Sequence, residues 1–245
     1  EGMNLDTSEV HAQGADVSLV RTGLKAGTTY YYMLQGNNGR ITTTSNMMSF
    51  TTLPNMSPKL TSATLLSHGP MSAFVSYEIT DDGGEPMTET GCYVYQTGEL
   101  ENKQKYIIEN FDGKEGKIKL RIGNLERNAH YEFQSFARNT VGETIGTAIK
   151  YNTSDAITLN ETGELTQLMG NHLYDYTQLT IAGTLNGEDL SCLRLMMGRD
   201  NNNASTPGKL SDIVLTDVHL AAGGMVGPYH HEAAENQIVQ GTFAG

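Results

Sequence analysis

An internal repeat constrains the fold of this chain more than any other feature. Residues 24–32 and 125–133 lie 101 positions apart, and each begins with leucine, has glycine or asparagine three residues later and ends in aromatic residues. The same offset aligns Asn38 with Asn139, Phe50 with Tyr151, and 51–52 with 152–153. A period of about 100 residues is too long for a solenoid repeat but matches one β-sandwich domain. The sequence therefore predicts two copies of one sandwich.

Each copy carries the residues of a tyrosine corner. Tyr30 and Tyr131 follow a turn that contains a residue tolerant of positive φ. We expect each tyrosine hydroxyl to bond back to the backbone of that turn, and Leu24 and Leu125 to plug the sandwich from the preceding strand. Because one such hydrogen bond contributes only about 1 kcal/mol, its main effect is to fix where the chain turns.

Period-2 alternation locates the strands of the second copy. Segments 72–79 and 117–122 alternate apolar residues with others, which is typical of half-buried strands. We expect strands near 59–66, 71–80, 88–96, 103–110, 116–123, 129–138 and 146–152. The first copy begins only where the second has reached about residue 98, so its early strands are missing and its core is expected to be open unless the protein is longer.

The second copy resembles a fibronectin type III domain, and more closely the tandem copies on surface proteins of Bacteroidetes-type bacteria. The residues that carry this resemblance occur in order along the chain: Asp82-Gly83-Gly84, Gly91-Cys92, Tyr131, and Asn139 with Gly142. The resemblance implies a complete type III-like domain over 58–153 and a truncated one over 1–53. It also implies an extracellular location.

The pattern changes after about residue 155. Segment 186–198 predicts a helix, with acidic residues in its first turn and Gly198 after its last. Apolar strand-like segments lie on either side, at 179–185 and 210–220. A strand, a helix and a second similar strand form a right-handed coil with parallel strands.

Segment 210–220 has the spacing L-x-x-I-x-L-x-x-V-x-L, which resembles a leucine-rich repeat. The region 160–245 as a whole resembles the start of the BspA-like leucine-rich-repeat region of bacterial surface proteins. The residues carrying that resemblance are Leu179, Ile181, Leu185, Leu190, Met196, Gly198, Leu210 and Leu215. The expected fold class is therefore mainly β, with tandem fibronectin type III or immunoglobulin-like sandwiches and a small C-terminal α/β leucine-rich-repeat-like unit.

Charge and composition narrow the possible partners. Sixteen Lys and Arg stand against 28 Asp and Glu, for a net charge of −12, which disfavours nucleic acids and anionic membranes. The sequence contains no apolar run long enough to span a bilayer, so we expect no direct membrane insertion. Cys92 and Cys192 fall in different predicted domains, and we expect no disulfide between them. The sequence starts at Glu1 without a signal peptide, so we expect a fragment whose anchor lies in missing N-terminal sequence.

Two segments contain metal-ligand residue types. His230 and His231 precede Glu232 in a polar, glycine-rich segment, but adjacent side chains diverge, which favours a solvated loop over a metal site. Asp81 and Asp82 begin an Asp-Asp-Gly-Gly-Glu run that could hold calcium, although it lacks the alternation of an EF-hand loop. A tight turn is the favoured interpretation.

The sequence offers no catalytic constellation and no cofactor motif. It lacks a Gly-x-Ser-x-Gly elbow and a phosphate-binding loop with Lys-Ser/Thr, so we expect neither enzymatic activity nor a cofactor. Sugar-binding platforms commonly use exposed aromatic rings, and there is no Trp. Tyr229, with His230 and His231, is the weak candidate for a ligand surface.

Two functional hypotheses remain open. In the first, the chain belongs to a surface protein in which the type III domains act as a spacer and the repeat region binds a protein or glycan ligand. In the second, it is an accessory spacer or glycan-binding region of a secreted polysaccharide-degrading enzyme.

Overall fold

The computed structural model describes residues 18–227, 231–238 and 242. The chain divides into two compact units, an amino-terminal unit (Glu1–Asn55) and a main unit (Met56–Gly245). None of the described helices is long and apolar enough to cross a bilayer.

The amino-terminal unit contains two antiparallel ribbons. Strand β1 (Thr29–Tyr32) pairs with β4 (Met48–Thr51), and β2 (Gln35–Asn37) pairs with β3 (Thr42–Thr44). The Tyr30 ring stacks on Phe50, with centroids 5.9 Å apart. Phe50 is still 44% exposed, because no facing sheet covers this ribbon among the described residues.

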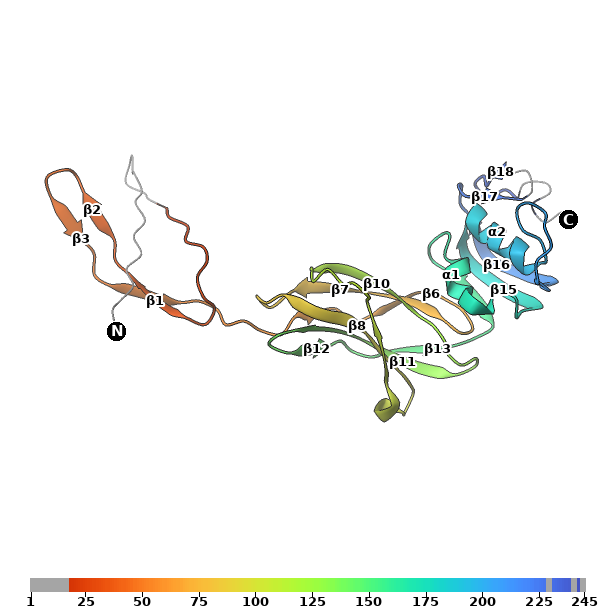
Figure 1. Ribbon diagram of the computed structural model, residues 1–245, viewed down its shortest axis with the longest axis horizontal. Helices are drawn as coiled ribbons and strands as arrows, with labels where there is room; N and C mark the ends of the chain where they lie inside the picture. Colours follow the sequence, from red (N-terminus) through yellow and green to blue (C-terminus); the bar gives the residue numbers. More distant parts are fainter. Residues whose placement is uncertain (1–17, 228–230, 239–241, 243–245) are drawn as a thin grey trace. The chain divides into compact units, whose positions relative to one another are not determined.

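In the main unit, residues from 59 to 152 form a sandwich of two antiparallel sheets (Figure 1). The first sheet contains β5 (Lys59–Leu60), β6 (Thr64–His68), β7 (Ala73–Asp81) and β10 (Gly116–Ile122). The second contains β8 (Met87–Gln96), β9 (Gln104–Ile107), β11 (His130–Asn139), β12 (Glu143–Ile145) and β13 (Ile149–Asn152), with the short helix η1 (Leu100–Asn102) between β8 and β9. The order β6–β7–β10 against β9–β8–β11–β13 is that of a fibronectin type III sandwich. The predicted fold class, mainly β with a sandwich of this type, is confirmed.

Alternation along β7 produces the sandwich core. Ala73, Val75, Tyr77 and Ile79 are each at most 3% exposed, as the period-2 pattern predicts. The expected first strand, 59–66, is interrupted between β5 and β6, and the expected last strand, 146–152, begins only at Ile149. Gly146 lies between β12 and β13, where a Cβ would collide with the Ser135 hydroxyl.

Parallel strands and helices alternate after the sandwich. The order is β14 (Ala156–Leu159), α1 (Leu165–Met169), η2 (Gly170–His172), β15 (Gln178–Leu185), α2 (Gly187–Met196) and β16 (Asp212–Leu220), followed by β17 (Met225–Val226) and β18 (His231–Glu232). Strand β15 pairs in parallel with β14 on one side and β16 on the other. We call the segment from β14 to β18 the coil.

Helix α2 forms where the sequence predicts it, because a capping box of reciprocal hydrogen bonds holds its first turn. The Asn186 side chain accepts hydrogen bonds from the N–H groups of Glu188 (3.0 Å) and Asp189, while the Asp189 carboxylate accepts from Asn186 N–H (3.0 Å). Asp189 is 1% exposed and also accepts from the N–H groups of Gly163 and Leu165. This one buried carboxylate therefore joins α2 to the loop before α1.

The sandwich and the coil share a sheet and a core. Strand β14 pairs with β6 at Thr158 and His68, so the first sheet of the sandwich continues through β14 to β16. Phe74 points away from the sandwich core and belongs to the same apolar cluster as Ile157 and Leu168 of the coil. The sandwich thus covers one end of the coil.

Polar contacts surround this shared core. Ser72 Oγ donates to the carbonyl of Leu168, and Arg121 Nε donates to the carbonyl of Gln167 at 2.6 Å. Lys119 forms ion pairs with Glu161 (2.5 Å) and with the buried Glu164. Together these contacts fix the coil against β7 and β10.

Truncation of Phe74 should destabilise the coil and the sandwich together. Phe74→Ala removes a ring that is 5% exposed, and such a change in a shared core costs about 3–5 kcal/mol. In urea titrations followed by far-UV circular dichroism, the midpoint of a single main transition should fall. Leu100→Ala, at a 52% exposed site, is the control and should change stability by less than about 0.5 kcal/mol. Separate melting of the helical signal, with the sandwich unaffected, would contradict the shared core.

Candidate functional site

The two tyrosines of the repeat make the same hydrogen bond. The Tyr131 hydroxyl accepts from Glu126 N–H at 2.9 Å, and the Tyr30 hydroxyl accepts from Lys25 N–H at 2.7 Å. Leu125 is 2% exposed, whereas Leu24 is half-buried. These side chains hold turns rather than a ligand.

A threonine completes each corner, and sequence reasoning assigned no role to it. Thr52 Oγ1 accepts from Thr28 N–H (2.9 Å) and donates to a carbonyl before the turn. Thr153 Oγ1 accepts from Ala129 N–H (2.8 Å) and donates in the same way. Threonines that lie 101 positions apart therefore make equivalent hydrogen bonds in the two copies. The aligned threonines were the signal that could have revealed them.

The candidates for a ligand surface fall at the edge of the described residues. Tyr229 and His230 lie outside them. The backbone of His231 belongs to β18, where it pairs with Val226 of β17. The weak ligand role of these three residues stays a prediction, and so does the preference for a solvated loop over a metal site. The segment containing β17 and β18 was expected to be a polar loop, yet Val226 and Ala233 are buried.

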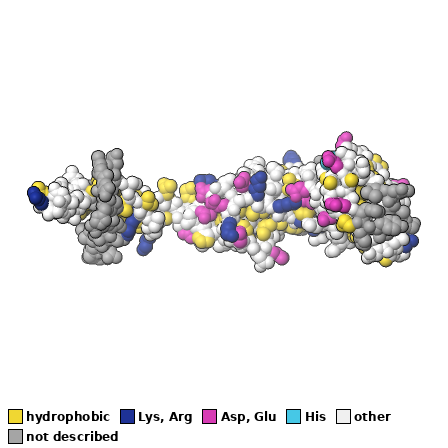
Figure 2. Space-filling view, turned by 90° about the horizontal axis from the view of Figure 1, so that it is seen from above, with side chains coloured by type: hydrophobic (Ala, Val, Ile, Leu, Met, Phe, Trp, Pro, Cys, Tyr) yellow, Lys and Arg dark blue, Asp and Glu magenta, His cyan; other side chains and the backbone are white. Residues whose placement is uncertain are grey.

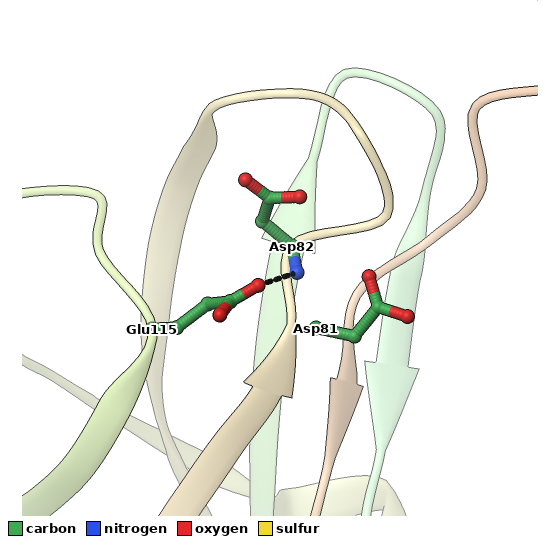
Figure 3. A group of neighbouring side chains, drawn as sticks. All are labelled: Asp81, Asp82 and Glu115. Atoms are coloured by element: carbon green, nitrogen blue, oxygen red, sulfur yellow. Dashed lines mark hydrogen bonds between the residues drawn. The ribbon is translucent and has the colours of Figure 1, made fainter. Parts of the chain in front are cut away.

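Asp81 and Asp82 lie near a third carboxylate that sequence reasoning did not identify. Glu115 precedes β10, and one oxygen of each of the three carboxylates lies within 4.8 Å of the others (Figure 3). A Glu 33 residues away from the Asp pair gives no local sequence signal. The pairing of β7 with β10 brings it to the turn.

The hydrogen bonds of this acidic group are those of a braced turn. Asp81 pairs with Lys59 at 2.7 Å and accepts from Gly83 N–H at 2.9 Å. Asp82 Oδ1 accepts from Gly84 N–H at 2.7 Å, and Glu115 Oε1 accepts from Asp82 N–H at 2.8 Å (Figure 3). The Lys59 hydrogen bond is the main cause that lowers the pKa of Asp81. A hard cation could bind here only in competition with Lys59.

The two thiols are unsuited to nucleophilic chemistry. Cys92 lies in the sandwich core and Cys192 in the core of the coil, and both are free thiols. Burial raises the pKa of Cys92 to about 12 and that of Cys192 to about 11. Both therefore stay protonated at neutral pH, and a thiol rather than a thiolate is a poor nucleophile.

One face of the coil's sheet is open. Leu179, Ile181 and Leu185 of β15 are buried in the cluster that includes the helices, so Thr180, Ala182 and Thr184 point to the opposite face. These three side chains are only half-buried. Beside Thr180 on β16 lies Val214, which is 54% exposed. We call this surface, made by Thr158, Thr180, Ala182, Thr184, Val214 and His219, the sheet face.

Charges are mixed on the surface of the main unit. On the face drawn in Figure 2, basic and acidic side chains lie interspersed along the sandwich. Ion pairs of the sandwich include Lys105 with Glu89 and Arg138 with Glu143.

Comparisons with known proteins identify other β-sandwich domains at low similarity. Neither a protein-family model nor a curated protein sequence matches this chain. Among solved structures, chicken CNTN1 FN1–FN3 domains match with a TM-score of 0.34 and 14% identity, covering 54% of this chain and 45% of that one. The third fibronectin III domain of human KIAA0343 protein matches with a TM-score of 0.31 and 16% identity, covering 40% of this chain and 84% of that one.

A further match is the sensor domain of the anti-sigma factor RsgI4 in Pseudobacteroides cellulosolvens. Its TM-score is 0.31 at 12% identity, and the match covers 40% of this chain and 96% of that one.

Loss of the Tyr131 hydroxyl should weaken the main unit alone. Tyr131→Phe leaves the part-buried Glu126 N–H without its acceptor, which should lower the free energy of unfolding by about 1–2 kcal/mol in urea titrations. Tyr30→Phe removes the equivalent bond of the other unit and is the matched control, so it should leave the main transition unchanged. Equal effects of the two variants on that transition would show that the units are not independent.

The contribution of Asp81 to stability should disappear in acid. Because its pKa in the folded state lies below the ordinary value of 3.8, that contribution is present above this value and is lost as the pH falls through the folded-state pKa. The difference in the free energy of unfolding between the wild type and Asp81→Asn should be largest at about pH 6 and should disappear as the pH falls below 3.8. Urea midpoints across this range measure it, with the exposed Glu101→Gln as control. A gap that is independent of pH would refute the pairing with Lys59.

Proposed function

We propose that this chain is a non-enzymatic region of an extracellular surface protein, in which the coil presents the sheet face to a protein or glycan ligand. The supporting observation is the open sheet face itself. The helices cover the other side of the parallel sheet and the sandwich covers one end, whereas Thr180, Thr184 and Val214 remain accessible.

The chemistry of this face suits many weak contacts. Threonine hydroxyls donate and accept hydrogen bonds, and Val214 adds apolar area beside them. A flat surface on a rigid sheet loses little conformational entropy when a partner binds. The parallel order β14–α1–β15–α2–β16 also supports the resemblance of 160–245 to a leucine-rich-repeat unit.

The sandwich has a second role in this proposal. Terminal repeats of solenoid proteins need a cap, because an uncovered end exposes apolar surface. Phe74 and the strand pairing of β6 with β14 supply such a cover. The type III-like domain of the main unit is therefore both a spacer and the amino-terminal cap of the coil.

Binding to immobilised ligands tests this function. The intact chain is applied to a glycan array and to purified mucins, and we expect binding to at least one of them. The double variant Thr180→Arg, Val214→Arg should lose binding at least about tenfold, because two long charged side chains obstruct the face. Glu101→Arg on η1 is the control, placing the same side chain on the sandwich. Full binding by the face variant, or no binding to any surface, would count against the proposal.

The alternative places the chain beside a catalytic domain of a secreted polysaccharide-degrading enzyme. The coding sequence that follows Gly245 distinguishes the two. Further leucine-rich repeats support the adhesive surface protein, whereas a glycan-degrading catalytic domain supports the accessory region.

A further inference from the structure

A small cavity lies within the main unit where the sandwich meets the coil. Its volume is about 160 Å³. Met71 and Asn124 line it from loops of the sandwich, and Leu168, Asn171 and His172 line it from α1 and η2, with Arg121 of β10 between them. The cavity is smaller than the roughly 300–1,000 Å³ of pockets for drug-sized ligands, so it suits only a small ligand.

Arg121 is an exposed residue that lines this space and brings a positive charge to it. Its Nε donates to the Gln167 carbonyl, but among the described residues neither Nη group has a hydrogen-bond acceptor and no carboxylate pairs with it. Burial lowers the pKa of the guanidinium, which reflects lost hydration. A guanidinium whose Nη donors have no acceptor in the described part of the protein can bind a carboxylate through two parallel hydrogen bonds.

Two glycines make room for the guanidinium. A Cβ at Gly123 would lie 2.6 Å from Nη1, and a Cβ at Gly170 would lie 2.6 Å from Nη2. Gly170 also has φ of 52°, a conformation that other residues rarely adopt. The guanidinium therefore lies close to both glycines, and a side chain at either position would displace it from its present place.

Polar side chains lie beside Arg121 in this cavity. The side-chain amides of Asn124 and Asn171 have no hydrogen-bond partner within the described part of the chain. His172 Nδ1 lies 2.8 Å from Asp175 Oδ2, which orients the imidazole and leaves Nε2 for another partner. Amides and an imidazole nitrogen can both donate and accept, as sugar hydroxyls require.

We propose that this cavity binds the carboxylate of an acidic monosaccharide, a uronic acid, either free or at the end of a glycan. The planar fork of Arg121 matches a carboxylate, and the two amides and His172 match hydroxyls on the ring. Met71 and Leu168 offer apolar contact to the C–H groups of a sugar. The inference does not depend on the sheet face, since the cavity is lined by other residues.

Calorimetric titration of the full chain with sodium glucuronate, sodium galacturonate and glucose tests the proposal. At least one uronate should bind saturably, and glucose should bind at least about tenfold more weakly because it lacks the carboxylate. Arg121→Gln should weaken uronate binding at least about tenfold. Lys117→Gln, on the same strand, is the matched control and should bind as the wild type does.

A second variant separates binding from folding, because Arg121 also bonds to Gln167. Asn171→Asp keeps Arg121 and its backbone contact but adds a negative charge at the cavity, so it too should weaken uronate binding at least about tenfold. Its thermal midpoint should stay near that of the wild type. Unchanged binding in both variants, or equal binding of glucose and the uronates, would overturn the proposal.

Two further ligands test the sugar class. Acetate carries the carboxylate alone, and acetyl-dialanine carries it at the end of a peptide. Both should bind more weakly than the better uronate. Tighter binding of the peptide would overturn the sugar assignment in favour of a peptide carboxyl terminus, and equal binding of acetate would show that the ring contributes nothing.

Discussion

The packing of Phe74 against the coil is the interaction on which the rest of the main unit depends. Its ring leaves β7 on the side opposite the sandwich core and enters the cluster that holds Ile157 and Leu168. The β6–β14 pairing lies beside it, so backbone hydrogen bonds and apolar burial join the same two parts. A parallel strand-and-helix coil has an apolar end that water would otherwise reach. Here a β-sandwich covers it.

The two corners show how much of the burial pattern comes from the partner sheet. Tyr30 pairs with Phe50 in the same register in which Tyr131 pairs with Tyr151. Tyr151 is 4% exposed and Phe50 is 44% exposed. Local sequence therefore sets the turn, the register and the hydrogen bonds. Burial requires the second sheet, which the aligned part of the first copy does not include.

The sequence was sufficient for elements whose signal is local. Alternation predicted β7, and the acidic first turn together with Gly198 after the last turn predicted α2. Helix α1 escaped prediction because five residues give too little periodicity for a helical pattern. Phe74 falls on the face of β7 that alternation assigns to solvent, so its burial could be known only once the coil was in place. The same holds for Glu115, which reaches the acidic turn through strand pairing.

Native-state hydrogen exchange tests most directly whether the sandwich and the coil form one cooperative unit. The amides of Phe133 in the sandwich core and Ile181 in the coil core serve as reporters, and their opening free energies are measured over increasing urea. The shared core predicts that both converge on the same global value, within about 1 kcal/mol. Exchange of Ile181 through a separate, lower-energy opening, while Phe133 stays protected, would contradict it.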